Sequence, residues 1–287
     1  MDASKLPPAA RWLPADTFRG QTAVVTGGGT GLGLEIARGL AALGARVVVA
    51  SRNTEHHAPL LEEAARCEWS VESHALDVRE AADVRRLANE LRELHGRIEL
   101  LVNNAAGNFV CPAERLSANA WRSVLGIVLD GTFYCSKSFG RGMIADGGGS
   151  ILNIVATYAW TGMPGVVHSA SAKAGVLAMT KTLAAEWAPH QIRVNAIAPG
   201  PFESEGAGAN LWPDEESRAK IERGIPLGRF GTAEEMAAHC LHLLSPASAY
   251  VTGECLVVDG GGSLAQPFWD KGKRFQRKRA AAEGGEQ

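Results

Sequence analysis

Three side chains in the middle of the chain have the types and the spacing of a polar active site. Ser169 and Lys173 lie four residues apart in a stretch with a helical apolar pattern, so their side chains share one face of the predicted helix. Tyr158 follows an apolar run that predicts a strand, and its hydroxyl can reach the same space. A lysine there can hold ribose hydroxyls or lower the pKa of a neighbouring acid. A tyrosine at such a position is also commonly a packing residue.

The element that must position this chemistry is the segment 22–44. A short β-branched run leads into a cluster of glycines, and apolar residues at helical spacing follow. Glycines let the backbone turn sharply and approach a pyrophosphate, which the N-terminus of the helix attracts. We therefore expect dinucleotide binding by the turn residues Thr26, Gly27, Thr30, Gly31, Leu32 and Gly33. The spacing Gly-x-x-x-Gly-x-Gly departs from the common Gly-x-Gly-x-x-Gly fingerprint, so an ordinary glycine-rich turn is the alternative.

The second predicted strand, 46–51, ends in Ser51 and Arg52. The residue at this strand end usually meets the adenosine ribose, and an acidic residue there would accept a hydrogen bond from the 2′-hydroxyl of NAD. Hydrogen-bond donors and a positive charge suit a 2′-phosphate instead. The sequence thus favours NADP, and an exposed arginine in a loop is the alternative interpretation.

Strands alternate with helices along the rest of the chain, which predicts one α/β domain with a doubly wound sheet of seven parallel strands. The remaining strands are expected at 71–76, 98–102, 150–155, 193–198 and 254–258. Ligands of such sheets bind beyond the carboxyl ends of the strands. We expect the polar strand ends Thr26, Ser51, Asp77 and Asn103 to open on that edge.

Composition narrows the class of protein. The formal charge of −2 over 287 residues leaves no basic footprint for nucleic acid. Without an apolar leader at residues 1–20 or a run of 18 uncharged apolar residues, we expect a soluble, cytoplasmic protein with no membrane partner. Five widely spaced cysteines fit a reducing compartment. His239 and His242 lack further ligand motifs, so no metal site is expected.

Several segments have an open role. The expected boundaries are an extension at 1–20, the domain at 21–263 and a basic tail at 264–287, with a long polar loop at 202–223 as a lid over the site or a disordered stretch. The tail is either solvated or a patch for the phosphates of an acidic substrate. Asp130 lies within an apolar helical run, where a carboxylate is either a paired structural acid or part of a polar site.

From about residue 14 to 263 the chain resembles the short-chain dehydrogenase/reductase family. The resemblance rests on Thr26-Gly27-x-x-x-Gly31-x-Gly33, Asp77-Val78, Asn103-Asn104-Ala105-Ala106-Gly107, Lys173 and Pro199-Gly200. It implies a seven-stranded Rossmann sheet, a nicotinamide cofactor and usually a homotetramer. The family's active site normally has Tyr-x-x-x-Lys with a serine thirteen residues before the tyrosine. Here Ser169 occupies the tyrosine position and Ala156 the serine position.

One branch is similar at these points of departure, the NADPH-dependent 2,4-dienoyl-CoA reductases of mitochondrial type. The matching segments are 103–109, 114–117, 169–175 and 199–201. In that branch the acting tyrosine lies eleven residues before the serine, which corresponds to Tyr158 before Ser169, and an assisting asparagine falls at Asn108. The implied cofactor contacts are Ser51, Arg52, Asp77, Val78, Asn104, Ala105, Ala106, Gly107, Lys173, Pro199, Gly200 and Pro201, besides the glycine-rich turn.

The resemblance implies an acyl-CoA substrate and hydride transfer from NADPH to C5 of a 2,4-dienoyl thioester. Tyr158 and Asn108 would stabilise charge on the thioester oxygen, Lys173 would hold the nicotinamide ribose, and Ser169 would help to place the cofactor. Protonation of C2 by water would give a 3-enoyl-CoA. Two alternatives are a carbonyl reductase of 3-oxoacyl thioesters, for which Ser169 is a poor proton donor, and a nucleotide sensor without catalysis.

Overall fold

Seven parallel strands form the centre of the computed structural model, which describes residues 6–203 and 214–264. Their order in the sheet is β3-β2-β1-β4-β5-β6-β7. The strands are β1 (Thr22–Thr26), β2 (Arg46–Ser51), β3 (Val71–Ala75), β4 (Leu100–Asn103), β5 (Gly149–Ile154), β6 (Ile192–Pro199) and β7 (Cys255–Val258). All five residues of β1 are buried, as expected for a parallel strand covered on both faces. The predicted α/β fold with a doubly wound seven-stranded sheet is confirmed.

The order of the strands reverses between β1 and β4, and this places a crevice at their carboxyl ends. Ala23 of β1 pairs with Val47 of β2 on one side and with Leu100 of β4 on the other. The chain that leaves β1 therefore turns to one side of the crevice, and the chain that leaves β4 turns to the other. The loops after β1, β2 and β4 converge there.

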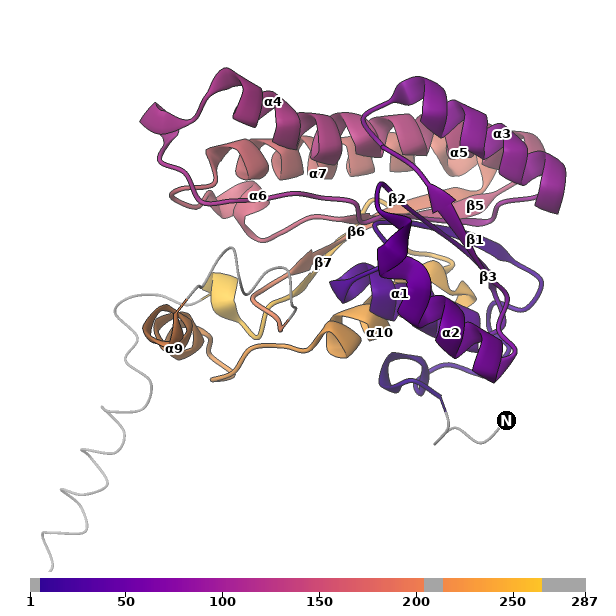
Figure 1. Ribbon diagram of the computed structural model, residues 1–287, viewed down its shortest axis with the longest axis horizontal. Coiled ribbons are helices and arrows are strands. Elements are labelled where there is room, and N and C mark those ends of the chain that lie inside the picture. The colour runs from indigo at the N-terminus through magenta and orange to yellow at the C-terminus, as the bar shows by residue number, and fades with distance from the viewer. Residues whose placement is uncertain (1–5, 204–213, 265–287) are drawn as a thin grey trace, which may run out of the picture.

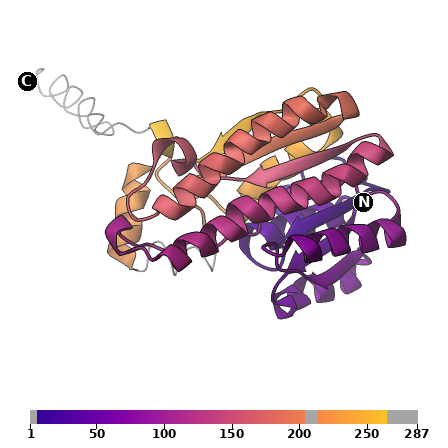
Figure 2. The same ribbon diagram turned by 90° about the horizontal axis from the view of Figure 1, so that it is seen from above.

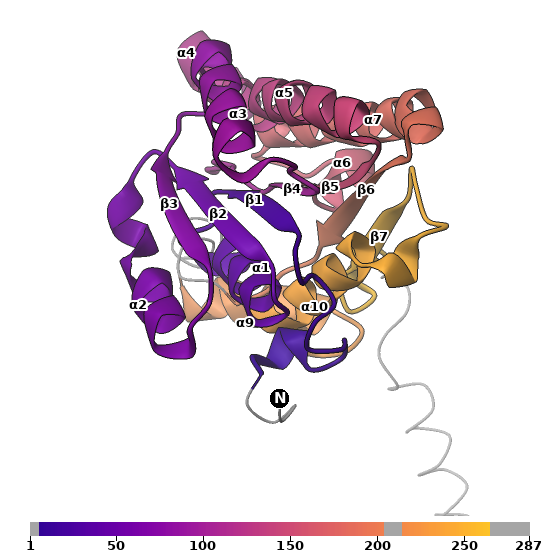
Figure 3. The same ribbon diagram turned by 90° about the vertical axis from the view of Figure 1, so that its right-hand side faces the viewer.

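Helices cover both faces of the sheet (Figures 1 and 3). One face carries α1 (Gly31–Ala42), α2 (Ala58–Cys67) and α10 (Ala233–Leu244), and the other carries α3 (Ala81–His95), α4 (Ala118–Leu125), α5 (Gly131–Asp146) and α7 (Val167–Trp187). The remaining α-helices of the described residues are α6 (Tyr158–Thr161) and α9 (Glu215–Gly224). Figure 2 shows the rod formed by α4 and α5 beside α7.

An apolar core lies between each helical layer and the sheet. The first core joins α1 and α10 through fully buried residues such as Ile36, Leu40 and Leu241. Residues Leu6, Ala9 and Phe18 of the N-terminal segment pack into this same core, because a 3₁₀ turn at Pro8–Ala10 lies against α1 and α10. The second core lies between the sheet and α3, α5 and α7. Burial of this much apolar surface holds the loops at the sheet edge in fixed positions.

Helix starts follow the side-chain signals in the sequence. Ser117 caps α4 by accepting a hydrogen bond from the amide of Ala120. Thr232 and Glu235 form a reciprocal capping box at the start of α10. The polar stretch at 202–223 includes α9, which Asp214 caps. Residues 204–213 of the expected lid, and the expected tail from residue 265 onward, lie outside the described residues.

Asp130 requires a correction. It ends a π-helical turn, Gly126–Asp130, that joins α4 to α5. The extra residue of this turn rotates the helix surface, so that Val128 is buried while the side chain of Asp130 is exposed to solvent. Asp130 is therefore not the buried carboxylate that its apolar neighbours suggested. No helix within residues 6–203 and 214–264 has the length and apolar character needed to cross a membrane.

Candidate active site

A cleft of about 460 Å³ opens at the carboxyl ends of β1, β2 and β4. It collects nine of the residues predicted to hold a cofactor, namely Gly27, Thr30, Ser51, Arg52, Asp77, Val78, Asn104, Ala105 and Ala106. Ala50, Asn53, His56, Leu76 and Ile127 also line it, although the sequence patterns did not identify them. Ile127 reaches the cleft because it lies on the π-helical turn. A break in a helix rarely leaves a signal in sequence periodicity.

Glycine is required in the first turn by both conformation and space. Gly27 and Gly31 have φ values of +65° and +52°, a region that favours glycine. A Cβ atom on Gly33 would lie 2.3 Å from the carbonyl oxygen of Gly27 and 2.4 Å from Nδ2 of Asn104. Asn104 Nδ2 itself donates to the carbonyls of Thr26 and Gly27, at 3.0 Å each. The turn after β1 is thus fixed to the loop after β4 by a contact that only glycine permits.

Two of the polar strand ends do not open on the cleft as expected. The Thr26 hydroxyl donates to the carbonyl of Val102 at 3.2 Å and accepts from the amides of Asn104 and Ala105 at 3.0 and 3.1 Å. Asn103 is buried and donates to the side chains of Ser136 and Asn153. These side chains face inward, where the Thr26 hydroxyl and the Nδ2 of Asn103 find partners within the protein. They shape the edge of the sheet, and a direct contact from Thr26 to a cofactor stays a prediction.

The far end of the cleft carries charge. Ser51 ends β2, Arg52 follows it, and Asp77 lies after β3. Arg79 binds the Asp77 carboxylate through Nε at 2.9 and 3.0 Å, and this hydrogen bonding holds the pKa of Asp77 below its ordinary value. Asp77 is therefore ionised and paired with Arg79. The side chain of Arg52 is exposed.

Tyr158, Ser169 and Lys173 lie together outside the lining of this cleft, at the catalytic end of the site. Tyr158 begins α6, and its hydroxyl lies 3.1 Å from Oγ of Ser169 on α7. Burial raises the pKa of Tyr158, although its hydrogen bond with Ser169 acts in the opposite direction. The phenol therefore remains neutral and able to donate near neutral pH.

Lys173 lies one turn after Ser169 on the same helix and is buried. Its Nζ donates to the carbonyl oxygen of Ile154 at the end of β5. Burial lowers the pKa of Lys173 to about 8, because the charged form loses hydration. The ammonium group is still mostly charged at neutral pH and is held in place by the strand.

Asn108 keeps one side of its amide free. Its Oδ1 accepts from the amide of Phe109 at 2.9 Å, while its buried Nδ2 has no hydrogen-bond partner among the described residues. The buried ring of His168 lies 4.4 Å from that of Phe109, and neither of its nitrogens has a partner within the same residues. Such nitrogens are unusual, because most buried polar groups have a hydrogen-bond partner.

The loops beside Tyr158 and Asn108 carry exposed apolar side chains. Val110 is 56% exposed, Trp160 45% and Met163 41%. The two loops are joined, because the amide of Cys111 donates to the carbonyl of Gly165 at 2.8 Å. An apolar surface of this kind beside a polar cluster is typical of a binding site for an amphipathic ligand.

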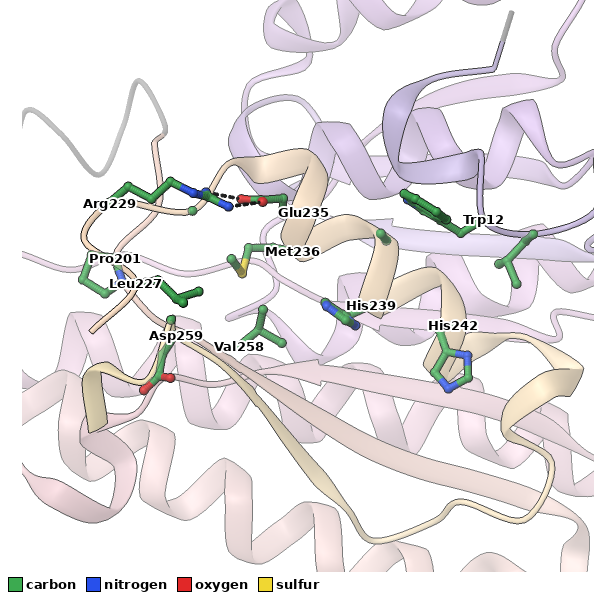
Figure 4. A pocket seen from close by; sticks show the side chains of 14 residues that line it. Trp12, Pro201, Leu227, Arg229, Glu235, Met236, His239, His242, Val258 and Asp259 are labelled. Carbon is green, nitrogen blue, oxygen red and sulfur yellow. Dashed lines mark hydrogen bonds and ion pairs between the residues drawn. The ribbon is translucent and has the colours of Figure 1, made fainter. Parts of the chain in front are cut away.

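The remaining predicted residues lie elsewhere. Pro199 ends β6, and a Cβ on Gly200 would lie 2.6 Å from Cα of Asp259. Pro201 lines a second pocket of about 550 Å³ between α10, β7 and the N-terminal segment. Figure 4 shows His239 and His242 on α10 facing this pocket, with the Arg229–Glu235 ion pair at its other end. No three histidine, cysteine or acidic side chains in the described part of the chain are grouped as metal ligands.

Comparisons with known proteins agree with this geometry. The family model described as enoyl-(acyl carrier protein) reductase matches residues 27–263. A protein of Bacillus subtilis (strain 168), named a probable 2,4-dienoyl-CoA reductase that produces (2E)-enoyl-CoA, is 45% identical over 83% of this chain and 94% of its own length. A peroxisomal 2,4-dienoyl-CoA reductase of Danio rerio, named as producing (3E)-enoyl-CoA, is 42% identical over 87% of this chain and 83% of its own.

A solved structure is also similar to this chain over most of its length. The gluconate 5-dehydrogenase of Burkholderia cenocepacia J2315, in complex with NADP and tartrate, has a TM-score of 0.82 and 36% identity over 88% of this chain and 99% of its own. The family match and this NADP-bound structure support a nicotinamide cofactor. The chain belongs to the short-chain dehydrogenase/reductase family of oxidoreductases.

Proposed function

We propose that this chain is an NADPH-dependent 2,4-dienoyl-CoA reductase. One observation carries the proposal: the hydroxyl of Tyr158 meets Ser169 at 3.1 Å, one helical turn before the buried Lys173. The site therefore has a tyrosine, a serine and a lysine together, although the tyrosine comes from α6 and not from α7 as in the usual family motif. The names of the relatives in Bacillus subtilis and Danio rerio point to the same substrate class.

The cleft residues fit a nicotinamide dinucleotide. Helix α1 begins at Gly31 without a side-chain cap, which leaves its first N–H groups for a pyrophosphate. When bound, NADPH supplies the hydride. Arg52 and Ser51 would hold its 2′-phosphate, and Lys173 would hold the nicotinamide ribose.

Tyr158 and Asn108 supply hydrogen bonds where negative charge develops. The phenol of Tyr158 is neutral, so it can donate to the thioester oxygen of a dienoyl substrate. The unpartnered Nδ2 of the partly exposed Asn108 is proposed as a second donor. Ser169 fixes the orientation of the Tyr158 hydroxyl, and Lys173 adds positive charge nearby. The apolar surface of Val110, Trp160 and Met163 suits an acyl chain.

The position of the double bond in the product depends on which carbon takes the proton. The names of the relatives divide between (2E)- and (3E)-enoyl products. We assign the (3E) product, because Tyr158 acts at the thioester oxygen and water can then protonate the adjacent carbon, C2. A conjugated thioester takes its proton on carbon and needs only hydrogen bonds at oxygen, so the usual family tyrosine is dispensable.

The test is a substrate comparison with product analysis. The protein is incubated with NADPH and either a trans-2,trans-4-dienoyl-CoA or the 3-oxoacyl-CoA of equal length. We expect faster NADPH oxidation with the dienoyl thioester and a 3-enoyl-CoA product. A 3-hydroxyacyl-CoA as the faster product would assign a carbonyl reductase instead, and cofactor binding without turnover of either thioester would assign a nucleotide sensor. A 2-enoyl-CoA product would show that the proton is added at C4 and not at C2.

We also propose a cytoplasmic homotetramer. Apolar side chains are exposed on α5, α7 and β7, at Phe133, Val167 and Val257. The five cysteines are free thiols, which fits a reducing compartment. Light scattering of the purified protein measures the assembly directly, and a monomeric mass would contradict this part of the proposal.

A further inference from the structure

His57 lies beneath the adenosine end of the cleft and contacts the first turn from below. It ends the 3₁₀ turn Thr54–His57, which follows β2, and it is fully buried. A Cβ atom on Gly29 would lie only 2.8 Å from Cδ2 of the His57 ring. The imidazole thus packs between the glycine-rich turn and the serines Ser51 on β2 and Ser73 on β3.

Both ring nitrogens of His57 have serine partners. Nε2 lies 2.7 Å from Oγ of Ser51, and Nδ1 lies 2.6 Å from Oγ of Ser73 on β3. The Ser51 hydroxyl also lies 2.9 Å from the carbonyl oxygen of Asn53. A chain of hydrogen bonds therefore runs from the edge strand β3, through His57, to Ser51, which faces the cleft.

Counting protons fixes the direction of this chain. A carbonyl oxygen can only accept, so the single hydroxyl proton of Ser51 is donated to Asn53. Ser51 must then accept from Nε2–H of His57, and the bare Nδ1 must accept from the hydroxyl of Ser73. Burial, together with the neighbouring His56 and His74, lowers the pKa of His57, which agrees with a neutral ring.

The direction matters for the ligand that Ser51 meets. A 2′-phosphate needs donors, whereas a ribose 2′-hydroxyl is best held by an acceptor, as carboxylates do in NAD enzymes. With Nε2–H donating to it, Ser51 keeps its own proton on the side of the cleft, where this proton can turn from the carbonyl of Asn53 to a bound 2′-phosphate. In the opposite tautomer, the bare Nε2 of His57 would accept the Ser51 proton. Only lone pairs of the Ser51 oxygen would then face a phosphate.

We propose that His57 is a positioning residue that makes Ser51 a hydrogen-bond donor and thereby favours NADPH over NADH, with Ser73 fixing the His57 tautomer. This inference rests on the proposed NADPH-binding function. It reaches beyond the contacts of Ser51 and Arg52, because Ser73 lies outside the lining of the cleft. A purely structural His57 that supports Gly29 would instead affect both cofactors equally.

Cofactor binding to Ser73→Ala tests the proposal, with the exposed Ser70→Ala as the matched control. Dissociation constants of NADPH and NADH are measured by nucleotide fluorescence without substrate. We expect Ser73→Ala to weaken NADPH about three- to tenfold, the worth of one hydrogen bond, and to leave NADH within about twofold. Equal losses for both cofactors, or no loss, would overturn the proposal.

Substitution of His57 itself gives a second test. His57→Gln keeps an amide N–H that can reach Ser51, so we expect it to retain more of the NADPH preference than His57→Phe, which has no donor. Equal preferences in the two variants would count against the proposal. If His57→Phe fails to fold, the Ser73→Ala measurement and the spectroscopic test still decide the matter.

The tautomer can be observed directly. A long-range ¹H–¹⁵N spectrum of the wild-type protein at neutral pH should show His57 with a protonated Nε2 and a bare Nδ1. A protonated Nδ1 would overturn the inference with no reference to any cofactor. A wild type that does not prefer NADPH would overturn the cofactor assignment and this inference together. If the wild type prefers NADPH and Ser73→Ala retains that preference, this inference alone would be overturned.

Discussion

The nucleotide end of the site, at the cleft, and the catalytic end, at Tyr158, are built in different ways. At the adenosine end, the polar groups of Thr26, Asn104, Ser51 and His57 are hydrogen-bonded to one another, and the glycine-rich turn is fixed by close backbone contacts. At the catalytic end, Asn108 and His168 have buried nitrogens with no partner in the described ranges 6–203 and 214–264.

This difference corresponds to what each end has to bind. The nucleotide end recognises a ligand of constant shape, so its geometry can be completed within the protein. The catalytic end leaves donors unpaired and apolar side chains exposed, which a substrate would satisfy. A substitution at the first end should therefore act on cofactor affinity, and one at the second end on turnover.

The largest effect is expected for Gly33→Ala. The added methyl would meet the carbonyl of Gly27 at 2.3 Å and Asn104 Nδ2 at 2.4 Å, so the turn after β1 must move. We expect NADPH affinity to fall by more than about a hundredfold, because several backbone contacts to the pyrophosphate are lost together. Calorimetric titration measures the loss.

Gly142→Ala on α5 is the matched control for Gly33→Ala. Its Cβ would contact only Cδ of Arg92 at 3.8 Å, so alanine should stabilise this helix by roughly 0.5–1 kcal/mol. Equal cofactor affinity in Gly33→Ala and Gly142→Ala would contradict the rigid description of the nucleotide end.

Lys173→Met tests the buried lysine of the catalytic end through the free energy of unfolding. Burial that lowers the lysine pKa from 10.5 to about 8 costs the folded state on the order of 3 kcal/mol at neutral pH. Loss of the hydrogen bond to Ile154 offsets part of the gain, so we expect the variant to be roughly 1–2 kcal/mol more stable at pH 7 in urea unfolding.

The pH dependence of this gain has a definite sign. Between pH 8 and 10.5 the unfolded state binds the lysine proton more tightly than the folded state, so wild-type stability rises with pH there. The advantage of Lys173→Met should therefore shrink by pH 10. Lys181→Met, at an exposed position on α7, should show no such change. A destabilised Lys173→Met at pH 7 would argue that the ammonium group is not strained by burial.

Arg52→Ala should have a smaller, selective effect at the nucleotide end. A charge-assisted phosphate contact contributes about 1.5–3 kcal/mol, so NADPH should bind roughly tenfold more weakly or worse while NADH changes little. Arg66→Ala, an exposed arginine on α2, is the control. Equal losses of the two cofactors in Arg52→Ala would remove the NADP assignment.

The sequence predicted the fold because its signals are local. Apolar runs, the glycine-rich turn and the capping box of Thr232 and Glu235 each act within one element, and all reappear in the structure. The convergence of Tyr158, Ser169 and Lys173 was also predictable, from helical spacing and from the family resemblance.

What the sequence missed depends on tertiary structure. The His57 network joins residues on two strands and a 3₁₀ turn, and Ile127 reaches the cleft through a π-helical turn that leaves no mark on periodicity. Asn103 was expected at the cleft, but its side chain satisfies a buried network with Ser136 and Asn153. The adjacent His56 and His57, which follow Arg52 after three residues, were the one signal that could have indicated a role near the ribose.

The central claim is that the hydroxyl of Tyr158 acts at the catalytic end while the nucleotide end works independently of it. Single-turnover hydride transfer from NADPH to a trans-2,trans-4-dienoyl-CoA, measured for the wild type and Tyr158→Phe, tests this most directly. We expect a rate about a hundredfold lower in Tyr158→Phe with unchanged NADPH affinity, because the aromatic ring stays and only the hydroxyl donor is lost. A variant as fast as the wild type would contradict it and return Tyr158 to the role of a packing residue.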